Sequence, residues 1–382
     1  MFDVIVLGLG AMGSAATCYL SRRGKRVLGI EQFTAAHEKG SSHGSSRIIR
    51  QAYFEHPDYV PLLLRAYELW EKLERDRDTQ LLRLTGGLMI GPPESDVVKG
   101  SIQSARENNL QYAVLDAQEV RRRFPVFNPE PSEIAVYESS AGYLRPEDCI
   151  RAHLAEASRH GATLHFEESV VGFAADRPSE PIAVRTESAT YKAERLIITS
   201  GAWAPHLLAD LGLPLVVTRQ VMCWFEPTEG ISQFLPSQFP VYIWDGGARW
   251  PFYGFPAIDG SSRGVKVAIH GSSNVCTAST IDRQIHNEDI ARIRERIAAR
   301  IPTLNGPLLE AKTCLYTITP DGHPVIGLHP QHPGIVIAAG FSGHGFKFSN
   351  TVGEILADLA DKGETHQRIG LFSPVRFRSE SR

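Results

Sequence analysis

Two short segments carry the basic residues that are best suited to bind a small anion. The segment "AAGFSGHGFKFS" (338–349) places Lys347 between two phenylalanines, directly after the apolar run "GIVIA". Burial of an unpaired lysine costs several kcal/mol, so Lys347 is expected to meet either an internal carboxylate or an anionic ligand. The segment "GSSHGSSRIIR" (40–50) places Arg47 and Arg50 three residues apart, and arginine is suited to bidentate binding of a carboxylate. The alternative for this second segment is a surface turn with two solvated arginines.

Two further segments have the alternating pattern of strands and contain reactive side chains. "FYGFP" and "VKVAIH" supply Tyr253, Lys266 and His270, and the last two stand four residues apart, which places them on one face of a strand. "TCLYTITPDGHPVIG" supplies Cys314 and Tyr316, also on one face. A solvated sheet face explains the first group equally well, and Cys314 alone is compatible with a small buried apolar residue.

The N-terminal residues match a dinucleotide-binding fingerprint. The apolar run "DVIVL" (3–7) is followed by Gly8, Gly10 and Gly13, by a helix-compatible stretch, and by a second apolar run that ends at Glu31. This order of strand, glycine turn, helix, strand and acid allows a pyrophosphate to bind at a helix N-terminus and a ribose hydroxyl to bind the acid. The motif is common to FAD and NAD proteins, so it leaves the choice between them open.

The rest of the chain indicates an α/β fold with two parts. "AERLIITSGAWAPHLL" and "GIVIAAGFSGHGFKFSNTVGEILADLA" repeat the order strand, glycine turn and helix, whereas the intervening segments are richer in proline, aromatic residues and alternation. We expect a Rossmann-like domain built from discontinuous segments and a sheet-rich, mainly antiparallel substrate domain. The predicted boundaries are 1–85, 141–215 and 311–382 for the first domain, and 86–140 and 216–310 for the second.

Composition excludes several classes of protein. The chain has 382 residues, 42% hydrophobic and 22% charged, which is typical of a globular protein with more than one core. A net charge of -3 argues against nucleic acid or an anionic membrane as partner. Five scattered cysteines favour a reducing compartment, and without CxxC or HExxH motifs no metal site is expected. No apolar run approaches the roughly 20 residues of a membrane span, so a cytoplasmic protein is expected.

One resemblance is more specific than these patterns. "HGSSRIIRQAY", "YVPLLLRAYELW", "FYGFP", "CLYT" and "AAGFSGHGFKFS" follow one another in this order from near the N-terminus to near the C-terminus. On these segments the chain resembles the monomeric sarcosine oxidase family, which includes N-methyltryptophan oxidase and the peroxisomal pipecolate and sarcosine oxidases. The resemblance implies a monomer with covalently bound FAD that oxidises a C–N bond of a secondary amino acid and reduces O2 to H2O2.

The resemblance also implies roles for individual residues. Cys314 matches the cysteine that forms a thioether with the flavin 8α-methyl group. Lys347 and Arg50 match the pair that binds the substrate carboxylate. Lys266 resembles the lysine that faces flavin N5 and promotes reaction with O2. Residues expected beside the flavin or in the substrate pocket are Arg47, His43, Tyr253, His270 and Tyr316.

Taken together, the fingerprint and the resemblance predict three groups of residues. The catalytic group is Lys266, Arg47, His270 and Tyr253, and the substrate-binding group is Arg50, Lys347, Tyr253, His270 and Tyr316. The cofactor-binding group is Gly8, Gly10, Gly13, Glu31, His43, Ser46, Arg47, Cys314, Gly343, His344, Gly345 and Lys347.

The flavin loop departs from the family's usual pattern. It reads "GSSHGSSR" where the family more often has "GSHHGDTR", so that Ser42, Ser45 and Ser46 replace His, Asp and Thr. Hydroxyl groups can still hydrogen-bond a phosphate or a flavin carbonyl. The loss of a carboxylate and an imidazole leaves the completeness of flavin attachment open.

Two alternative enzymes and one alternative of another class fit the same sequence. A primary amino acid oxidase of the glycine or D-amino acid type would share the fold, and so would an oxidase of glycated amino acids. A non-catalytic flavin-binding subunit would need none of Lys266, Lys347, Arg50 and Cys314, all of which are present.

Overall fold

The computed structural model describes residues 1–175, 180–247 and 249–377. Its first sheet has eight strands in the order β10-β11-β12-β1-β2-β9, with β20 pairing with both β12 and β19. Strand β1 runs parallel to β2 and β12, and β12 runs parallel to β20, as in a nucleotide-binding sheet. The strands are β1 (Phe2–Leu7), β2 (Val27–Ile30), β9 (Thr163–His165), β10 (Val170–Ala174), β11 (Ile182–Thr186), β12 (Thr190–Ile198), β19 (Val325–Leu328) and β20 (Ile335–Ala339).

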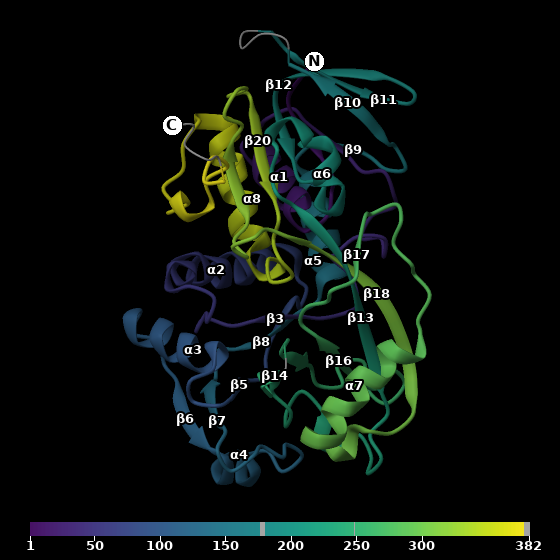
Figure 1. Ribbon diagram of the computed structural model, residues 1–382. Helices are drawn as coiled ribbons and strands as arrows, with labels where there is room; N and C mark the ends of the chain where they lie inside the picture. The colour runs from purple at the N-terminus through teal and green to yellow at the C-terminus, as the bar shows by residue number, and fades with distance from the viewer. Residues whose placement is uncertain (176–179, 248, 378–382) are drawn as a thin grey trace.

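The second sheet has nine strands and is mainly antiparallel. Its order is β17-β13-β16-β15-β14-β5-β7-β6, with β18 pairing with β13, and the β14–β5 pair is parallel. Its strands are β5 (Gly87–Gly91), β6 (Ala113–Asp116), β7 (Ile134–Glu138), β13 (Val216–Phe225), β14 (Val241–Trp244), β15 (Phe252–Gly254), β16 (Val265–Ile269), β17 (Val275–Cys276) and β18 (Leu308–Ile318). The sheets lie in different halves of the molecule (Figure 1).

A third, small sheet carries one of the predicted arginines. It has the order β3-β8-β4, with β3 (Arg47–Ile49) and β4 (Leu82–Leu84) both antiparallel to β8 (Gly142–Leu144). Strand β3 directly follows the loop 40–46, so its pairing with β8 fixes where that loop ends. Helix α5 (Pro146–Arg159) begins two residues after β8, which brings its first turn close to the same loop.

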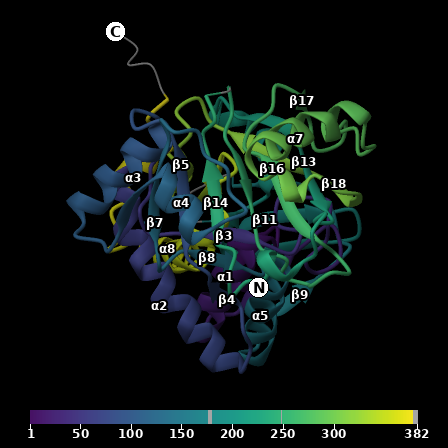
Figure 2. The same cartoon turned by 90° about the horizontal axis from the view of Figure 1, so that it is seen from below.

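The helices surround both sheets. Helices α1 (Ala11–Arg22) and α8 (Ser349–Lys362) pack against each other beside the first sheet, and α2 (Val60–Arg77) packs on α8. Helices α3 (Asp96–Glu107) and α7 (Asn287–Arg300) lie at opposite sides of the second sheet in both views (Figure 1 and Figure 2). The short helices are α4 (Ala117–Arg123) and α6 (Ala204–Leu207). Within the described part of the chain, no helix has both the length and the hydrophobicity needed to cross a membrane.

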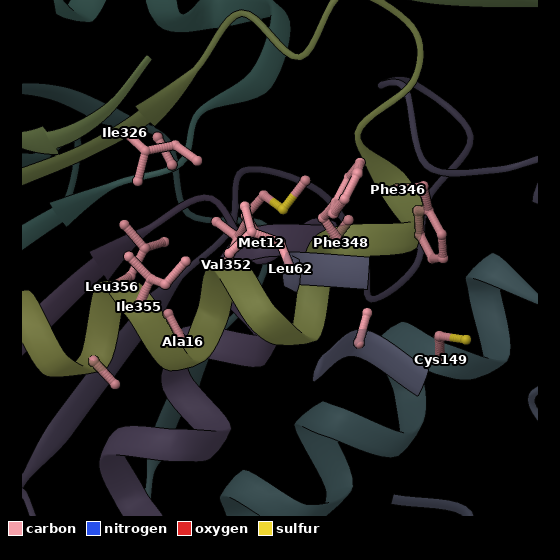
Figure 3. Close-up of a cluster of buried hydrophobic side chains, with 14 of the residues drawn as sticks. Met12, Ala16, Leu62, Cys149, Ile326, Phe346, Phe348, Val352, Ile355 and Leu356 are labelled. Carbon is pink, nitrogen blue, oxygen red and sulfur yellow. The ribbon is translucent and has the colours of Figure 1, made fainter. Parts of the chain in front are cut away.

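The largest hydrophobic cluster lies where α1, α2 and α8 meet. Figure 3 shows side chains of these helices gathered around one another, among them Met12, Ala16, Leu62, Val352, Ile355 and Leu356. Phe346 and Phe348 belong to the same cluster, so the residues on both sides of Lys347 are anchored in the core. Packing of these two rings therefore fixes the backbone at Lys347.

The predicted fold class is confirmed: the molecule has a Rossmann-like part assembled from discontinuous segments and a mainly antiparallel second sheet. The domain boundaries remain a prediction. Strand β18 runs through residue 311, where one boundary was placed, and pairs with β13 along most of its length. A division of the chain at that point would cut a continuous strand.

We predict that Gly353→Ala destabilises the protein, although alanine is the better helix former. A Cβ at Gly353 in α8 would lie 2.4 Å from the Cβ of Ala15 in α1, so the two helices would have to separate. Overpacking of this kind costs about 1–3 kcal/mol, more than the gain in helix propensity. The thermal unfolding midpoint should fall. The control is Gly172→Ala, since no heavy atom lies within 4 Å of a Cβ there, and an equal shift in both variants would contradict the explanation.

Candidate active site

A long cavity of about 220 Å³ follows the carboxyl edge of the first sheet. Its walls come from the loop after β1, from Glu31 after β2, from residues 199–203 after β12 and from residues 338–343 at the end of β20 and directly after it. The carboxyl ends of neighbouring parallel strands lie at the same edge, and this topology brings the four segments together. At its other end the cavity reaches Ser41, Arg47 and Tyr316.

The glycine fingerprint has the geometry that a pyrophosphate requires. Gly10 is the N-cap of α1 and lines the cavity, and a Cβ added to it would meet no heavy atom within 4 Å. No side chain caps this helix end, so its backbone amides are available to a phosphate. A Cβ at Gly13 would lie 1.8 Å from the carbonyl oxygen of Gly8, which explains why only glycine allows α1 to pack so closely on β1.

Other polar groups of the long cavity also fit a dinucleotide. Glu31 is 5% exposed, and its two carboxylate oxygens accept hydrogen bonds from the backbone N–H groups of Leu9 (2.9 Å) and Phe33 (3.1 Å). The fixed carboxylate keeps free lone pairs for ribose hydroxyls. The buried hydroxyl oxygens of Ser200 and Thr317 line the cavity and have no hydrogen-bond partner among the described residues. These orphaned groups need a polar ligand.

A second, smaller cavity of about 60 Å³ adjoins the first. The two cavities share Arg47, Tyr316, Gly343 and Phe346 in their walls. Gly343 has φ +83°, and a Cβ there would lie 2.2 Å from Cε2 of Tyr316, so the loop can approach the tyrosine ring only with glycine at this position. The remaining wall of the smaller cavity includes five predicted site residues: Arg50, Tyr253, His270, His344 and Lys347.

Arg50 is held rigidly at the smaller cavity. The residue is 1% exposed, and its guanidinium carbon lies 4.2 Å and 4.3 Å from the ring centroids of Tyr53 and Phe54. Nη2 donates to Glu55 (2.6 Å) and Nη1 to the carbonyl of Ala52 (2.7 Å), whereas Nε has no partner among the described residues. Arg50 therefore has an internal anion and keeps Nε as a nitrogen without a partner among the described residues.

Lys347 faces the same cavity, but fewer internal groups compensate its positive charge. Its Nζ donates to the carbonyl of His344 (2.7 Å) and lies 5.0 Å from the ring centroid of Tyr53. No carboxylate of the described residues forms an ion pair with it. Burial and the charge of Arg50 lower the pKa of Lys347 to about 7, although Glu55 raises it. An anion placed in this cavity would stabilise the charged lysine.

Glu55 is the acidic residue of this site, and its role was not expected from the sequence. Burial opposes its ionisation, but the charges of Arg50 and Lys347 outweigh burial and lower the pKa of Glu55 to about 2. Glu55 therefore remains a carboxylate at neutral pH. Glu55 forms an ion pair with Arg50, as the carboxylate of a bound ligand would.

Lys266 lies behind the flavin loop and lines neither cavity. The residue is 2% exposed, and Nζ donates to the carbonyls of Gly44 (2.7 Å) and Ser46 (2.9 Å) and to the Ser46 hydroxyl (3.3 Å). Phe255, a wall residue of the smaller cavity, lies with its ring centroid 4.7 Å from Nζ. Burial, followed by the charge of Arg47, lowers the pKa of Lys266 well below its ordinary value.

Cys314 and Arg47 contact each other at the end of the long cavity. Nη2 of Arg47 lies 3.8 Å from Sγ of Cys314 and also donates to the carbonyl of Ser41 (2.8 Å). The sulfur is 3.7 Å from the same carbonyl oxygen, and Cys314 is 2% exposed. The Arg47 guanidinium and the Ser41 carbonyl therefore fix the position of the sulfur.

Three buried histidines near the two cavities, His43, His270 and His344, are neutral at physiological pH. Burial lowers the pKa of His270 and of His344 to about 4, and burial together with the charge of Arg47 lowers that of His43 to about 3. Nδ1 of His270 lies 3.3 Å from the hydroxyl of Tyr316. Neither ring nitrogen of His43 has a partner among the described residues.

His344 links the hydroxyl of Tyr53 to the carbonyl of Gly322 through hydrogen bonds. Its Nε2 donates to the carbonyl of Gly322 (3.0 Å), so Nδ1 carries no proton and accepts from the hydroxyl of Tyr53 (2.6 Å). Tyr53 in turn lies against Arg50 and Lys347. The imidazole thus fixes the tyrosine that separates the two cations.

One group of potential metal ligands lies outside this site. Asp210, His329 and His332 offer ligand atoms within 4.8 Å of one another. However, Nδ1 of His329 accepts from the backbone N–H groups of Gln331 and His332, so the proton must be on Nε2, which donates to Asp210 (3.0 Å). A nitrogen that carries a proton cannot bind a metal ion. The group is better explained as a turn held by hydrogen bonds.

The family is decided by comparison with known proteins. A family model described as FAD dependent oxidoreductase matches residues 3–359. The chain belongs to this family. Its cofactor is FAD, which settles the choice that the glycine fingerprint left open, and the resemblance predicted from the sequence is confirmed.

Two sarcosine oxidases and one solved structure are among the most similar proteins. The monomeric sarcosine oxidase of Streptomyces avermitilis is 51% identical over 377 residues, which cover 98% of each chain. The monomeric sarcosine oxidase of Bacillus sp. (strain B-0618) is 38% identical and covers 97% of this chain and 95% of its own. NikD, described as an unusual amino acid oxidase essential for nikkomycin biosynthesis, has a TM-score of 0.86 at 24% identity and covers 98% and 97% of the two chains. The similarity to NikD shows a shared fold and no more.

The predicted site residues fall into two groups in space. Gly8, Gly10 and Glu31 of the fingerprint line the long cavity, together with Gly343 and Gly345, whereas Gly13 lies at the contact with Gly8 and outside the wall. The predicted substrate-binding residues line the smaller cavity. His43, Ser46, Lys266 and Cys314 lie directly behind the walls and contact or adjoin wall residues. Their individual roles remain predictions.

We predict that Gly10→Val yields a folded protein without FAD. A valine side chain at this position would project into the open space where the pyrophosphate must approach the backbone. The measurement is the ratio of flavin to protein absorbance after purification, with circular dichroism as the test of folding. Gly370→Val, at a site equally free of neighbouring atoms and outside the cavity, should retain its flavin. Retention of FAD by Gly10→Val would refute the assignment.

Proposed function

We propose that the protein oxidises the C–N bond of a small N-methylated or cyclic amino acid to an imine and reduces O2 to H2O2. The observation that carries this proposal is the position of Arg50 and Lys347. Both face a small cavity that shares wall residues with the long cavity, so a carboxylate bound there would lie next to the space that would hold FAD. The names of the two sarcosine oxidases that are 51% and 38% identical support the same class of substrate.

The size and charge of the smaller cavity favour a compact substrate with a neutral amine. Its volume of about 60 Å³ holds only a few water-sized groups, and its wall includes the apolar residues Ile48, Phe54, Ile243 and Phe255. The cations Arg47, Arg50 and Lys347 disfavour a positive charge on a bound amine and so lower the pKa of that amine. A neutral nitrogen has the lone pair that must assist departure of a hydride from the neighbouring carbon.

When bound, FAD would supply an acceptor for the hydride equivalent and a donor of two electrons to O2. The protein's own contribution is to orient the substrate through its carboxylate and to exclude water with the rings of Tyr253, Phe255 and Tyr316. We propose that Lys266 supplies the fixed positive charge that stabilises the negative charge on oxygen as O2 is reduced. Its three hydrogen bonds to the loop hold that charge in place.

We also propose that Cys314 is bonded to the flavin 8α-methyl group through a thioether. The support is the contact between Sγ and Arg47 at the end of the long cavity, on the strand that also supplies Tyr316. Acid precipitation followed by peptide mass analysis should find flavin on the Cys314 peptide. Flavin in the supernatant of wild-type protein would contradict the covalent bond.

We further propose that the enzyme is a cytoplasmic monomer. Its cysteines are all free in the structure, four of them buried, which suits a reducing compartment. The relatives named monomeric sarcosine oxidase support the oligomeric state.

The proposed reaction is tested by anaerobic mixing with sarcosine, N-methylalanine or pipecolate. At least one of them should bleach the flavin absorbance near 450 nm, and admission of O2 should restore it with one H2O2 per turnover. Glycine, the primary amine of similar size, is the control and should react much more slowly. Bleaching by glycine but by none of the secondary amines would indicate the alternative class of oxidase.

We predict that Arg50→Met and Lys347→Met each weaken substrate binding strongly. Each removes a buried cation that would pair with the carboxylate, and an interaction of this type contributes about 2–5 kcal/mol. KM for the amino acid should therefore rise at least about 30-fold. Arg65→Met is the control, because Arg65 pairs with Glu354 on the surface of α2 and lies outside both cavities. An unchanged KM in both active-site variants would contradict the assignment.

A further inference from the structure

The flavin loop is held from its outer side by a glutamate of α5. Glu147 lies in the first turn of α5, and its Oε1 accepts hydrogen bonds from the backbone N–H groups of Gly44 (2.6 Å) and Ser45 (3.1 Å). Its Oε2 is also 3.2 Å from the Ser45 nitrogen. A carboxylate in the first turn of a helix is stabilised by the helix dipole, so this anion is favoured where it stands.

The same loop is held from its inner side by Lys266. Nζ donates to the carbonyl of Gly44, which belongs to the same peptide group as the N–H of Ser45. The ammonium and the carboxylate therefore bind opposite ends of one peptide unit. Hydrogen bonds that share a peptide group polarise each other, so each strengthens the other.

This arrangement requires an unfavourable backbone conformation. Ser45 has φ +67°, a left-handed conformation that costs a residue with a side chain about 1–2 kcal/mol. Gly44 has φ +92°, and a Cβ there would lie 2.8 Å from the methyl carbon of Met222 and 3.5 Å from Nζ of Lys266. The hydrogen bonds to Glu147 offset this strain and keep the carbonyls of residues 44 and 46 turned toward the lysine.

Among the negative groups near Lys266, Glu147 raises the pKa of the lysine most. The charges of Arg47 and Arg263 oppose protonation of the lysine, whereas Glu147 and, to a lesser degree, Cys314 favour it. His43 and Lys266 also face each other, but burial keeps that histidine neutral. Arg263 donates to the hydroxyl of Ser45 and is itself paired with Glu310 and Asp259. No carboxylate of the described residues contacts Lys266 directly.

We propose that Glu147 is a positioning residue for the reaction with O2, which acts through the Gly44–Ser45 peptide to keep Lys266 oriented and charged. This inference rests on the proposed role of Lys266. It adds a second residue to the oxidative half of the reaction, although Glu147 touches neither cavity. Removal of its charge should lower the pKa of Lys266, and the lysine would then lose its proton at a lower pH than in the wild-type enzyme.

The test separates the two halves of the reaction in Glu147→Gln. Glutamine retains one acceptor oxygen for the loop but carries no charge. Anaerobic reduction of the flavin by sarcosine should keep its rate within about twofold. The pH profile of reoxidation by O2 should shift to lower pH, and at pH values above the pKa of Lys266 the rate should fall about tenfold for each unit by which that pKa is lowered. Asp148→Asn is the matched control, because Asp148 pairs with Arg151 on the surface and should leave both rates unchanged.

Two further variants make every outcome informative. Slow reoxidation in Lys266→Met with a wild-type rate and pH profile in Glu147→Gln would overturn this inference and leave the proposed function intact. Wild-type reoxidation in Lys266→Met would overturn the proposed role of the lysine itself. Should Glu147→Gln lose its flavin, Ser45→Gly is added to relieve the backbone strain. Slow, acid-shifted reoxidation of the double variant supports the inference, and wild-type reoxidation overturns it.

Discussion

The structure depends on four basic side chains, three of them buried and Arg47 half-buried, that lie in one region with little internal compensation. Arg47, Arg50, Lys266 and Lys347 surround the wall between the two cavities, and Glu55 is the one carboxylate that forms an ion pair with any of them among the described residues. Backbone carbonyls solvate the other three cations. Carbonyl dipoles compensate only part of the cost of burying a charge, so the region remains suited to bind an anion. A substrate carboxylate and the negative charge that develops during reduction of O2 both meet this requirement.

The fold explains why these cations can be placed so closely. Each comes from a different element: Arg47 from β3, Arg50 from the segment after it, Lys266 from β16 of the second sheet, and Lys347 from the turn before α8. The tertiary fold, and not a run of like charges along one element, therefore brings the four together. The core residues on both sides of Lys347, the pairing of β3 with β8 and the carboxylate of Glu147 each fix one member before any ligand binds.

The parts of the site that follow from local spacing could be predicted from the sequence, and the parts that depend on long-range contacts could not. Gly10 and Glu31 belong to a motif whose spacing already defines its geometry, and the structure places them as expected. The resemblance identified Arg50 and Lys347, but composition and periodicity alone left each with an ordinary alternative. Glu55 and Glu147 were missed, because Glu55 lies in an irregular segment and Glu147 is about 100 residues from the loop that it holds. The predicted boundary at residue 311 falls within β18, and the pairing of that strand with β13 is a long-range contact that local composition does not indicate.

The most direct test of this electrostatic account is the number of protons taken up when a carboxylate without an amine, such as propionate, binds to the oxidised enzyme. Burial lowers the pKa of Lys347 to about 7, so at about pH 8 the free lysine is mostly neutral. A bound carboxylate favours the charged form, and nearly one proton should be taken up per propionate, measured with a pH indicator in weak buffer. Lys347→Met should show no uptake. Binding without proton uptake, or equal uptake by the variant, would contradict the claim that the buried lysine receives the substrate's carboxylate.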